Sequence, residues 1–494
     1  MKGRTSAALG GLACAAVVLG VSHALAAALA PLSSPFLAVG AAAVDATPEP
    51  VKDFAVRTFG ERDKLVLLAG MAVVIATLAA GIGIAARRRP AVGYWALALL
   101  GAVGCAAALG RPGSSPAWAL PAVVGTLTGL GAFALLFRPE DSEDGTVRIG
   151  RRRLLGVFAG AGAAGLAGWA AGGATDVEKA RRDVVLPEPA SPAPQAEGIA
   201  REGLTPYLTP AEDFYRVDTA LSVPRIDPDD YVLRIGGRVG RPLEYTYRQL
   251  LDMPLIERDV TLSCVSNEIG GTLAGNARWL GVRLSDLLDL ARPEKGADQL
   301  VSRSADGWTC GTPAADCRDG RDAMLAVGMN GRPLPVEHGF PVRMIVPGHY
   351  GYVSATKWLT EIELSSFGDF DAYWTRRGWA ERTDIKTASR IDTPRSKARQ
   401  GAVAVAGVAW AQHRGISAVE VQVDDGPWNE ADLAPVTSDD TWRQWVWEWR
   451  AEPGEHLLRV RATDGEGDLQ EEEESEPFPS GATGLHTVRV TVAE

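Results

Sequence analysis

Apolar runs long enough to cross a bilayer dominate the first third of this chain. A membrane-spanning helix needs about 20 predominantly apolar residues. Five runs rich in Ala, Gly, Leu and Val meet this length, at residues 6–30, 65–86, 91–110, 117–137 and 154–173. One such run could be a buried core helix or a cleaved signal peptide. Five in succession instead predict a multi-pass membrane region over residues 1–175, with no charged residue inside the spans to mark a transport path.

The clusters of basic residues beside these runs fall on one side if all five runs cross, and the opposite side is mixed in charge. Lys2 and Arg4 precede the first run, ARRRP (86–90) follows the second, and RIGRRR (148–153) precedes the fifth. Because Lys- and Arg-rich loops stay in the cytoplasm, the chain after about residue 174 is expected to be extracytoplasmic. The paired arginines and Ala/Gly-rich run of 151–173 are also typical of a twin-arginine export signal. An ordinary basic membrane anchor is the alternative.

The composition changes after the membrane region. Residues 176–203 contain VVLPEPASPAPQAEGIA, which predicts an extended, exposed linker. Residues 204–392 contain short strands (YVLRIGG, PVRMIVPG, KWLTEIEL) and one amphipathic helix over 283–291. Residues 393–494 alternate with period two, as in RQWVWEWR and HTVRVTV, which predicts an immunoglobulin-like β-sandwich. The expected class is α+β: a five-helix transmembrane region, a mixed α+β domain and an all-β sandwich.

The charge is unevenly distributed between these parts. Residues 1–175 carry 15 basic and 9 acidic residues, a net charge of +6. The whole chain carries −11, so the remaining residues carry −17. Nucleic acid is therefore not an expected partner, because binding phosphate backbones needs a basic surface.

One cysteine stands out in the soluble part. Cys264 follows a β-branched run in VTLSCVSNEIGG. A buried structural thiol and a thiolate ligand for a soft metal both suit this position. Cys310 and Cys317, in CGTPAADC, could form a disulfide outside the cytoplasm, and their spacing leaves that question open.

Four blocks in the same order make residues 204–494 resemble the sulfite oxidase family of molybdopterin enzymes. They are TPAEDFYRVDTALSVPRIDPDDYVLRIGG (205–237), CVSN followed by ARWLGVRLSDLL, MNGRPLPVEHGFPVRMIVPGHYGYVSATKWLTEIEL (329–364), and FDAYWTRRGW ahead of the sandwich. The resemblance implies a molybdenum-molybdopterin cofactor with the Cys264 thiolate as the protein ligand of molybdenum. In that family the C-terminal domain forms a homodimer, and the sequence leaves open whether this chain does the same.

The resemblance assigns cofactor-binding positions as well. The pterin carries an anionic phosphate, so its site should offer cations together with hydroxyl or backbone donors. The residues that match the family's cofactor contacts are Tyr215, Arg216, Asn267, Thr309, His338, Arg343, Ser354, Thr356 and Lys357.

The chain departs from the pattern of a sulfite-oxidising site. Two family arginines match Val217 and Ile269, and the tyrosine after the paired arginines matches Trp379. An arginine of the second domain survives as Arg414. The expected catalytic residues are therefore Cys264, Trp379 and Arg414. Each charge-assisted hydrogen bond is worth roughly 1.5–3 kcal/mol, so losing two arginines should weaken capture of a dianion. Sulfite is not the expected substrate.

These observations predict a membrane-anchored molybdopterin oxidoreductase that catalyses oxygen-atom transfer on a small molecule outside the cytoplasm. Reduction of a sulfoxide or N-oxide is one alternative, and a non-catalytic scaffold that keeps the fold is another. The chain has no CxxCH haem-attachment motif, and its apolar runs contain only one histidine, His23. Electrons are therefore expected to pass to a separate cytochrome or to the quinone pool.

Overall fold

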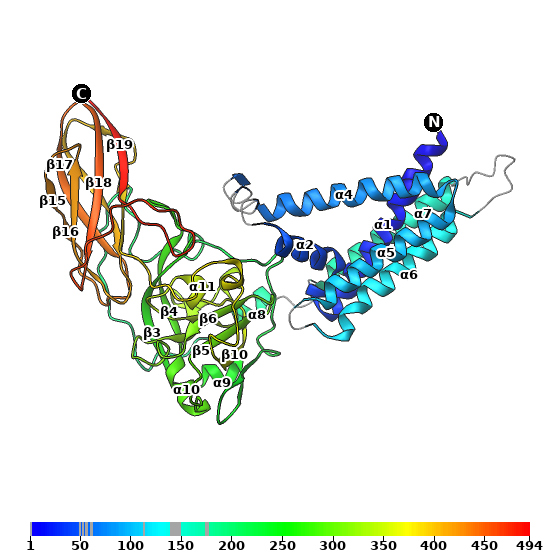
Figure 1. The fold of residues 1–494 in the computed structure, drawn as a ribbon, viewed down its shortest axis with the longest axis horizontal. Coiled ribbons are helices and arrows are strands. Elements are labelled where there is room, and N and C mark those ends of the chain that lie inside the picture. The colour runs from blue at the N-terminus through cyan, green and yellow to red at the C-terminus, as the bar shows by residue number, and fades with distance from the viewer. Residues whose placement is uncertain are drawn as a thin grey trace. The chain divides into compact units, whose positions relative to one another are not determined.

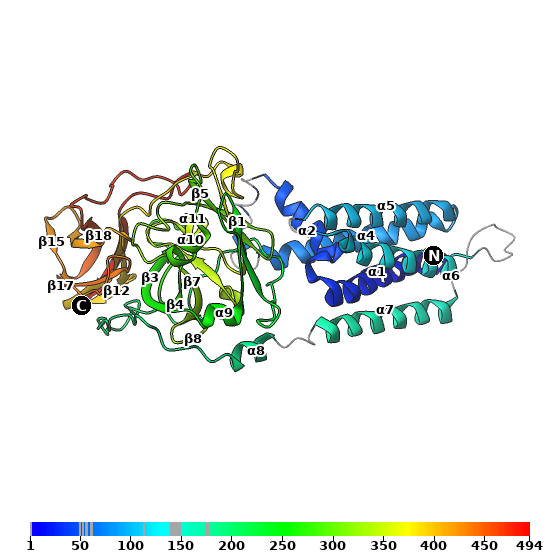
Figure 2. The same cartoon turned by 90° about the horizontal axis from the view of Figure 1, so that it is seen from below.

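The computed structural model describes residues 2–48, 51, 54, 58–59, 63–111, 114–138, 150–172 and 177–494. They form two compact units (Figures 1 and 2). One contains the helices up to Gly172 together with Thr219–Val223, and the other contains Val177–Asp218 and Pro224–Glu494. The expected boundary between membrane region and linker, at residues 175 and 176, lies outside the described residues.

The first unit consists of long apolar helices, in which α1 packs against α4, α6 and α7. Within the described residues, four helices are long and apolar enough to cross a membrane, which confirms four of the predicted runs as helices of that kind. The fifth run lies in the helix α7, and whether this helix crosses a membrane stays a prediction. Residue 173, the last residue expected in the run, lies outside the described residues. A short apolar helix, α2, was not predicted. The bounds are α1 Lys2–Leu29, α2 Pro35–Ala46, α4 Asp63–Ala86, α5 Pro90–Leu109, α6 Leu120–Leu136 and α7 Arg151–Gly172.

Small residues allow these helices to approach closely. A side chain on Gly11 of α1 would collide with the carbonyl oxygen of Ala79 in α4, and one on Gly83 would collide with that of Ala7. Membrane helices associate largely through such packing, because lipid tails remove the hydrophobic drive between helices. The Ala- and Gly-rich composition of the runs therefore serves contact between helices.

Two sheets lie within residues 204–392, whose bounds as a separate domain stay a prediction because β11 (Ala388–Thr393) crosses the expected boundary at residue 392. One has the strand order β2–β1–β10–β5–β6, with β1 and β10 parallel and the other neighbours antiparallel. The other has the order β3–β4–β7–β8, and β9 also pairs with β7. The three predicted strands fall on β1, β9 and β10, and the predicted helix falls on α10. The bounds are β1 Val232–Gly237, β2 Leu243–Thr246, α9 Tyr247–Leu251, β3 Leu255–Ser263, β4 Ala274–Arg283, α10 Leu284–Ala291, β5 Gln299–Ser304, β6 Thr309–Pro313, β7 Met324–Met329, β8 Arg332–Pro333, β9 Arg343–Ile345, α11 Gly351–Ser354 and β10 Leu359–Ser365.

The C-terminal part consists of two further sheets that share one core. Their strand orders are β11–β13–β17–β16 and β12–β19–β18–β14–β15. Val405 and Trp445 from the first sheet and Val421 and Val460 from the second are buried in the same cluster. The predicted β-rich domain is confirmed, and its immunoglobulin-like identity stays a prediction. The bounds are β11 Ala388–Thr393, β12 Lys397–Arg399, β13 Gly401–Trp410, β14 Ile416–Val423, β15 Trp428–Glu430, β16 Asp432–Leu433, β17 Arg443–Ala451, β18 Gly454–Asp464 and β19 His486–Ala493.

The predicted linker is mostly extended, but it is attached to the second unit. It begins with a short helix, α8 (Val177–Asp183). The Glu257 N–H in β3 then donates to the Ser191 carbonyl oxygen at 2.9 Å, and the Ile199 N–H donates to Gln444 Oε1 at 2.7 Å. Prolines keep this backbone out of a helix, so its polar groups find partners on the β-strands instead.

Candidate molybdenum-cofactor site

Cys264 directly follows the last residue of β3 and begins a tight loop. Its N–H donates to the Leu273 carbonyl oxygen at 2.9 Å, and Asn267 Oδ1 accepts from the Leu273 N–H at 2.8 Å. Burial raises the pKa of the half-buried Cys264 thiol, and hydrogen bonds from Ser266 and the charge of Lys357 oppose the rise. A metal ion would displace the proton from such a thiol. Asn267 shapes the loop, and its predicted contact with the cofactor stays a prediction.

Two of the predicted cofactor residues bind a carboxylate that the sequence analysis missed. Asp218, whose side chain is 5% exposed, accepts hydrogen bonds of 2.7 Å from both Arg216 Nε and Lys357 Nζ. Burial lowers the pKa of Lys357 to about 8, and its charge also interacts with Arg343. With all four side chains ionised, three cations and one carboxylate leave a net charge of +2. That charge suits a phosphate monoester dianion.

His338 and Arg343 are hydrogen-bonded to each other in the structure, and their predicted contact with the cofactor stays a prediction. Arg343 Nη1 donates to the His338 carbonyl oxygen at 3.1 Å, and His338 Nε2 lies 2.8 Å from the carbonyl oxygen of Ala211. Burial and the Arg343 charge lower the pKa of His338 to about 4, so the imidazole is neutral at physiological pH and Nε2 donates. Burial and the neighbouring Cys264 raise the pKa of Tyr215, which keeps its hydroxyl protonated.

Two of the predicted hydroxyl residues are buried and already engaged within the protein. Thr356 Oγ1 lies 2.6 Å from Ser302 Oγ, and Thr309 Oγ1 accepts from the Tyr373 N–H at 3.0 Å. These hydroxyls hold neighbouring strands and loops in position. Their direct contact with a cofactor stays a prediction.

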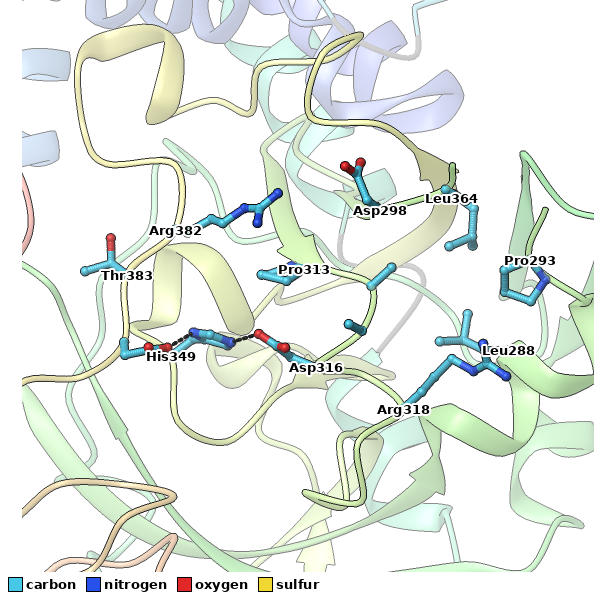
Figure 3. A pocket seen from close by; sticks show the side chains of 14 residues that line it. Leu288, Pro293, Asp298, Pro313, Asp316, Arg318, His349, Leu364, Arg382 and Thr383 are labelled. Atoms are coloured by element: carbon cyan, nitrogen blue, oxygen red, sulfur yellow. Dashed lines mark hydrogen bonds and ion pairs between the residues drawn. The ribbon is translucent and has the colours of Figure 1, made fainter. Parts of the chain in front are cut away.

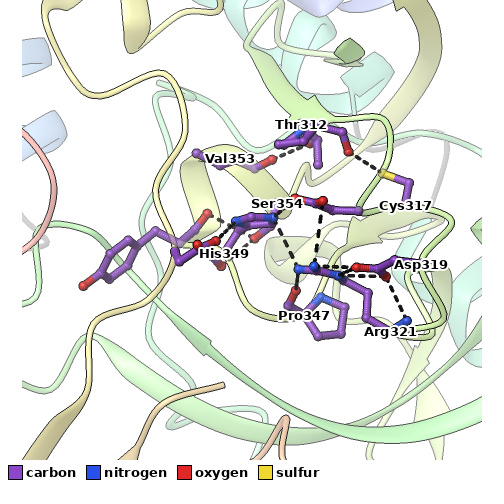
Figure 4. A network of polar contacts seen from close by, with 12 residues as sticks. Thr312, Cys317, Asp319, Arg321, Pro347, His349, Val353 and Ser354 are labelled. Carbon is purple, nitrogen blue, oxygen red and sulfur yellow. Dashed lines mark hydrogen bonds and ion pairs between the residues drawn. The ribbon is translucent and has the colours of Figure 1, made fainter. Parts of the chain in front are cut away.

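Ser354, the third predicted hydroxyl residue, belongs to a polar network that fixes the segment between β9 and α11 (Figure 4). Its hydroxyl donates to the His349 carbonyl oxygen at 3.0 Å. Arg321 Nη1 donates to the Pro347 carbonyl oxygen at 3.0 Å, and His349 Nε2 lies 2.7 Å from Asp316. The network therefore ties the loop between β6 and β7 to the segment that carries Ser354.

A cavity of about 560 Å³ lies beside this network (Figure 3). His349, Asp316, Asp384, Arg318 and Arg382 are among its lining residues. His349 Nδ1 lies 2.9 Å from an Asp384 oxygen, but the contact does not meet the geometry of a hydrogen bond. The residues that line the cavity include none of the predicted cofactor positions, so it is separate from the candidate metal site. The sequence analysis missed His349 because VPGHYG has no recognisable ligand spacing.

The two cysteines that could have paired are both free. Cys310 and Cys317 are buried thiols. Cys310 Sγ lies 3.6 Å from Thr312 Oγ1, and Cys317 Sγ donates to the Pro313 carbonyl oxygen at 3.6 Å. In this structure Cys310 and Cys317 therefore do not form a disulfide.

Trp379 lies in an aromatic group, as expected for an apolar wall. Its ring centroid is 6.0 Å from that of Tyr352, 6.2 Å from that of Trp374 and 5.3 Å from that of Phe478. The residue is 9% exposed, and its indole N–H meets no acceptor among the described residues. The aromatic group is present in the structure, and both its use as a substrate-facing wall and a catalytic role for Trp379 stay predictions.

Arg414 is engaged by other residues of the chain. Its Nε donates to Asp464 at 2.9 Å, and its Nη2 donates to the Ile385 carbonyl oxygen at 2.9 Å and to Thr387 Oγ1 at 3.2 Å. The Asp464 side chain is 2% exposed. Arg414 therefore joins the β-rich part to the chain just before β11. A direct role toward the substrate stays a prediction.

Replacing Arg414 separates these two roles. Arg414→Met is expected to lower the free energy of unfolding by about 2 kcal/mol, because hydrogen bonds to charged groups are worth roughly 1.5–3 kcal/mol and Asp464 would lose its partner. The Michaelis constant should stay unchanged. Urea unfolding and steady-state kinetics measure the two effects. Arg489→Met is the control, because Arg489 forms an exposed ion pair with Glu455. A raised Michaelis constant at unchanged stability would contradict this expectation.

The donors present fit a phosphate-bearing pterin. Arg343 Nε is buried and meets no acceptor in the described part of the chain, so one donor remains for a ligand. Gly339 adopts φ +113°, and a Cβ at this position would lie 3.1 Å from Lys357 Cα, so glycine leaves the space beside Lys357 that a larger residue would fill. Within the described residues, no group of three or more His, Cys, Asp and Glu side chains could hold a metal ion. A metal at Cys264 would therefore need further ligands from the cofactor.

Comparisons with known proteins agree with this site. Residues 220–374 match the model of the oxidoreductase molybdopterin binding domain. The chain is 31% identical over 289 residues to the mitochondrial sulfite oxidase of Rattus norvegicus, covering 49% of this chain and 52% of that protein. It is 30% identical over 336 residues to the sulfite oxidase of Gallus gallus, covering 57% of this chain and 71% of that protein. The chain thus spans about half the length of the mammalian relative.

A solved structure shares the fold. The structure of the sulfane dehydrogenase SoxCD from Paracoccus pantotrophus matches with a TM-score of 0.51 and 23% identity, covering 58% of this chain and 84% of that one. Residues 220–374 therefore form a domain of the oxidoreductase molybdopterin-binding type, which implies a molybdenum-molybdopterin cofactor. The chain belongs to the sulfite oxidase family.

Proposed function

We propose that this protein is a membrane-anchored molybdenum enzyme that catalyses oxygen-atom transfer on a small molecule outside the cytoplasm, and that sulfite is not its substrate. One observation carries the proposal. A lone thiol, Cys264, lies close to a buried cationic group with a net charge of +2, while Arg414 is already paired with Asp464. The site can hold an anionic cofactor, but its arginines are not arranged to capture a dianionic substrate.

Each residue has a defined task in this proposal. Cys264 would bind molybdenum, and Arg216, Arg343 and Lys357 would bind the pterin phosphate. Tyr215, kept protonated by its environment, can donate a hydrogen bond. When bound, the cofactor supplies two-electron chemistry, with molybdenum cycling between +6 and +4. The protein contributes binding, orientation and electrostatics.

The predicted cellular arrangement belongs to the same proposal. Four helices of spanning length support anchoring in a membrane, and the basic clusters favour an extracytoplasmic domain. Export by a twin-arginine signal at Arg151–Arg153 would deliver a folded, cofactor-loaded domain. Electrons would pass to a separate cytochrome or to the quinone pool, and the β-rich part would form a homodimer.

Reduction of a sulfoxide or N-oxide is the second candidate. The aromatic group around Trp379 favours a neutral substrate with an apolar substituent. A non-catalytic scaffold is less well supported. A buried cation such as Arg343 costs stability, and a scaffold has no reason to keep it.

Metal analysis and a substrate screen test the proposal. Full-length protein, purified from a host that makes the cofactor, is expected to contain about one molybdenum per chain. It should turn over a neutral S-oxide or N-oxide, or its reduced form, when supplied with an artificial electron donor or acceptor, and it should not oxidise sulfite. A well-folded protein without molybdenum would refute the proposal.

A further inference from the structure

The long segment between β18 and β19, residues 465–485, packs against the loop that carries Cys264. A side chain on Gly484 would collide with Ile269 of that loop. At the end of the segment, a side chain on Gly270 would collide with the ring of His486. The β-rich part therefore reaches the cysteine loop through this segment.

The same segment contacts two aromatic residues of the molybdopterin domain. A side chain on Gly481 would collide with the Tyr350 hydroxyl. The Ala380 N–H donates to the Pro479 carbonyl oxygen at 3.0 Å, and the Phe478 ring packs edge-on against Trp379 with centroids 5.3 Å apart at 79°. The 465–485 segment thus borders both the cysteine loop and the aromatic group.

Tyr350 links these contacts to the metal ligand. It is buried, its hydroxyl accepts from the Lys386 N–H at 3.3 Å, and it lies near enough to Cys264 for the thiolate charge to contribute to the raised pKa of the tyrosine. Tyr350 and Trp379 also belong to one buried cluster with Val265, the residue after Cys264. The 465–485 segment therefore packs beside the cysteine loop and the buried cluster that contains Val265.

The side chains around Phe478 in this segment are apolar and acidic, and they line a cavity whose lining residues include none of the predicted cofactor positions. Phe478 is 51% exposed although it is a large hydrophobic residue. Phe478 and Lys386 line a cavity of about 300 Å³ together with the carboxylates Glu471, Glu473, Glu474 and Glu476. A dianion would be repelled by these carboxylates, whereas a neutral molecule with an apolar substituent would gain from contact with Phe478.

We propose that Phe478 is a specificity-determining residue, which forms with Trp379 an apolar wall for neutral substrates that carry an aryl or bulky alkyl group beside the reacting atom. This inference rests on the proposed function and adds the substrate class to it. Phe478 acts by binding the substituent, and the chemistry at the metal is left to the cofactor.

The dissociation constants of three probes, measured by calorimetry on the oxidised full-length protein in detergent micelles, test this role. The probes are methyl phenyl sulfoxide, dimethyl sulfoxide and sulfite. We expect methyl phenyl sulfoxide to bind at least 10-fold more tightly than dimethyl sulfoxide, and Phe478→Ala to remove most of that difference. Phe478→Leu, which keeps an apolar surface, should retain part of it. Phe367→Ala is the matched control, because Phe367 instead packs under the Arg382 guanidinium at 4.2 Å.

Molybdenum content, measured on the same samples, separates the inference from the proposed function. Protein that lacks molybdenum when well folded refutes the proposed function. Protein that contains molybdenum but has equal affinity for the two sulfoxides, or an aryl preference that survives Phe478→Ala, overturns the inference alone. A preference for sulfite over the aryl sulfoxide contradicts both the inference and the proposed exclusion of sulfite.

Discussion

Cys264→Ser is expected to abolish molybdenum-dependent activity while leaving the fold intact. Serine is nearly isosteric with cysteine, but its hydroxyl is a hard ligand that stays protonated, whereas molybdenum is bound by soft thiolates. Even residues that only support a metal ligand typically cost 10–100-fold in affinity or activity when removed, so losing the ligand itself should cost more than about 100-fold. Metal analysis and X-ray absorption should show less molybdenum and one fewer sulfur neighbour.

Cys317→Ser is the matched control for this experiment. Cys317 is a buried free thiol in the same domain, and its Sγ donates to the Pro313 carbonyl oxygen at 3.6 Å. A serine there can make the same hydrogen bond, so molybdenum content and activity should match those of the wild type. If Cys264→Ser retained the metal–sulfur signal and the activity, Cys264 would be a structural thiol and the proposed site would be wrong.

Arg343→Met is expected to lose the cofactor and yet to unfold at a higher urea concentration. Burial lowers the pKa of Arg343 to about 10, which shows that the site disfavours the charge. Within the described residues, its guanidinium stacks 4.9 Å from the Trp279 ring and makes one hydrogen bond, to the His338 carbonyl oxygen. Replacing a poorly compensated buried charge with an apolar side chain of similar volume stabilises proteins by roughly 1–4 kcal/mol.

Pterin content and the urea midpoint of the cofactor-free protein measure these two effects. We expect cofactor retention to fall by about 100-fold, because a charge-assisted contact to phosphate is lost. Arg234→Met is the control: Arg234 is 64% exposed and pairs with Glu244 at 3.1 Å, so both readouts should stay near those of the wild type. Unchanged pterin content in Arg343→Met would show that the phosphate binds elsewhere.

The local features of this protein were predictable from its sequence. The apolar runs predicted helices of spanning length, and the alternation after residue 393 predicted the β-rich part. Each pattern reflects an interaction between residues that are close in the chain, or between one stretch of chain and its solvent. The blocks around Cys264 and His338 likewise predicted the family, because a thiolate loop and a phosphate-binding pair are short chemical motifs.

The site's electrostatics were decided by tertiary structure. Asp218 accepts from Lys357, which is 139 residues away, and Arg414 is paired with Asp464 rather than left for a substrate. No local pattern reveals these partners, because the strength of an ion pair depends on burial and on distances set by packing. The contact between Phe478 and Trp379 is likewise set by tertiary packing and not by a local sequence pattern. The sequence alone thus determined the apolar helices of spanning length, the family and the candidate metal ligand, whereas the folded chain decided how the charges around that candidate site are paired and which side chains lie beside the cysteine loop.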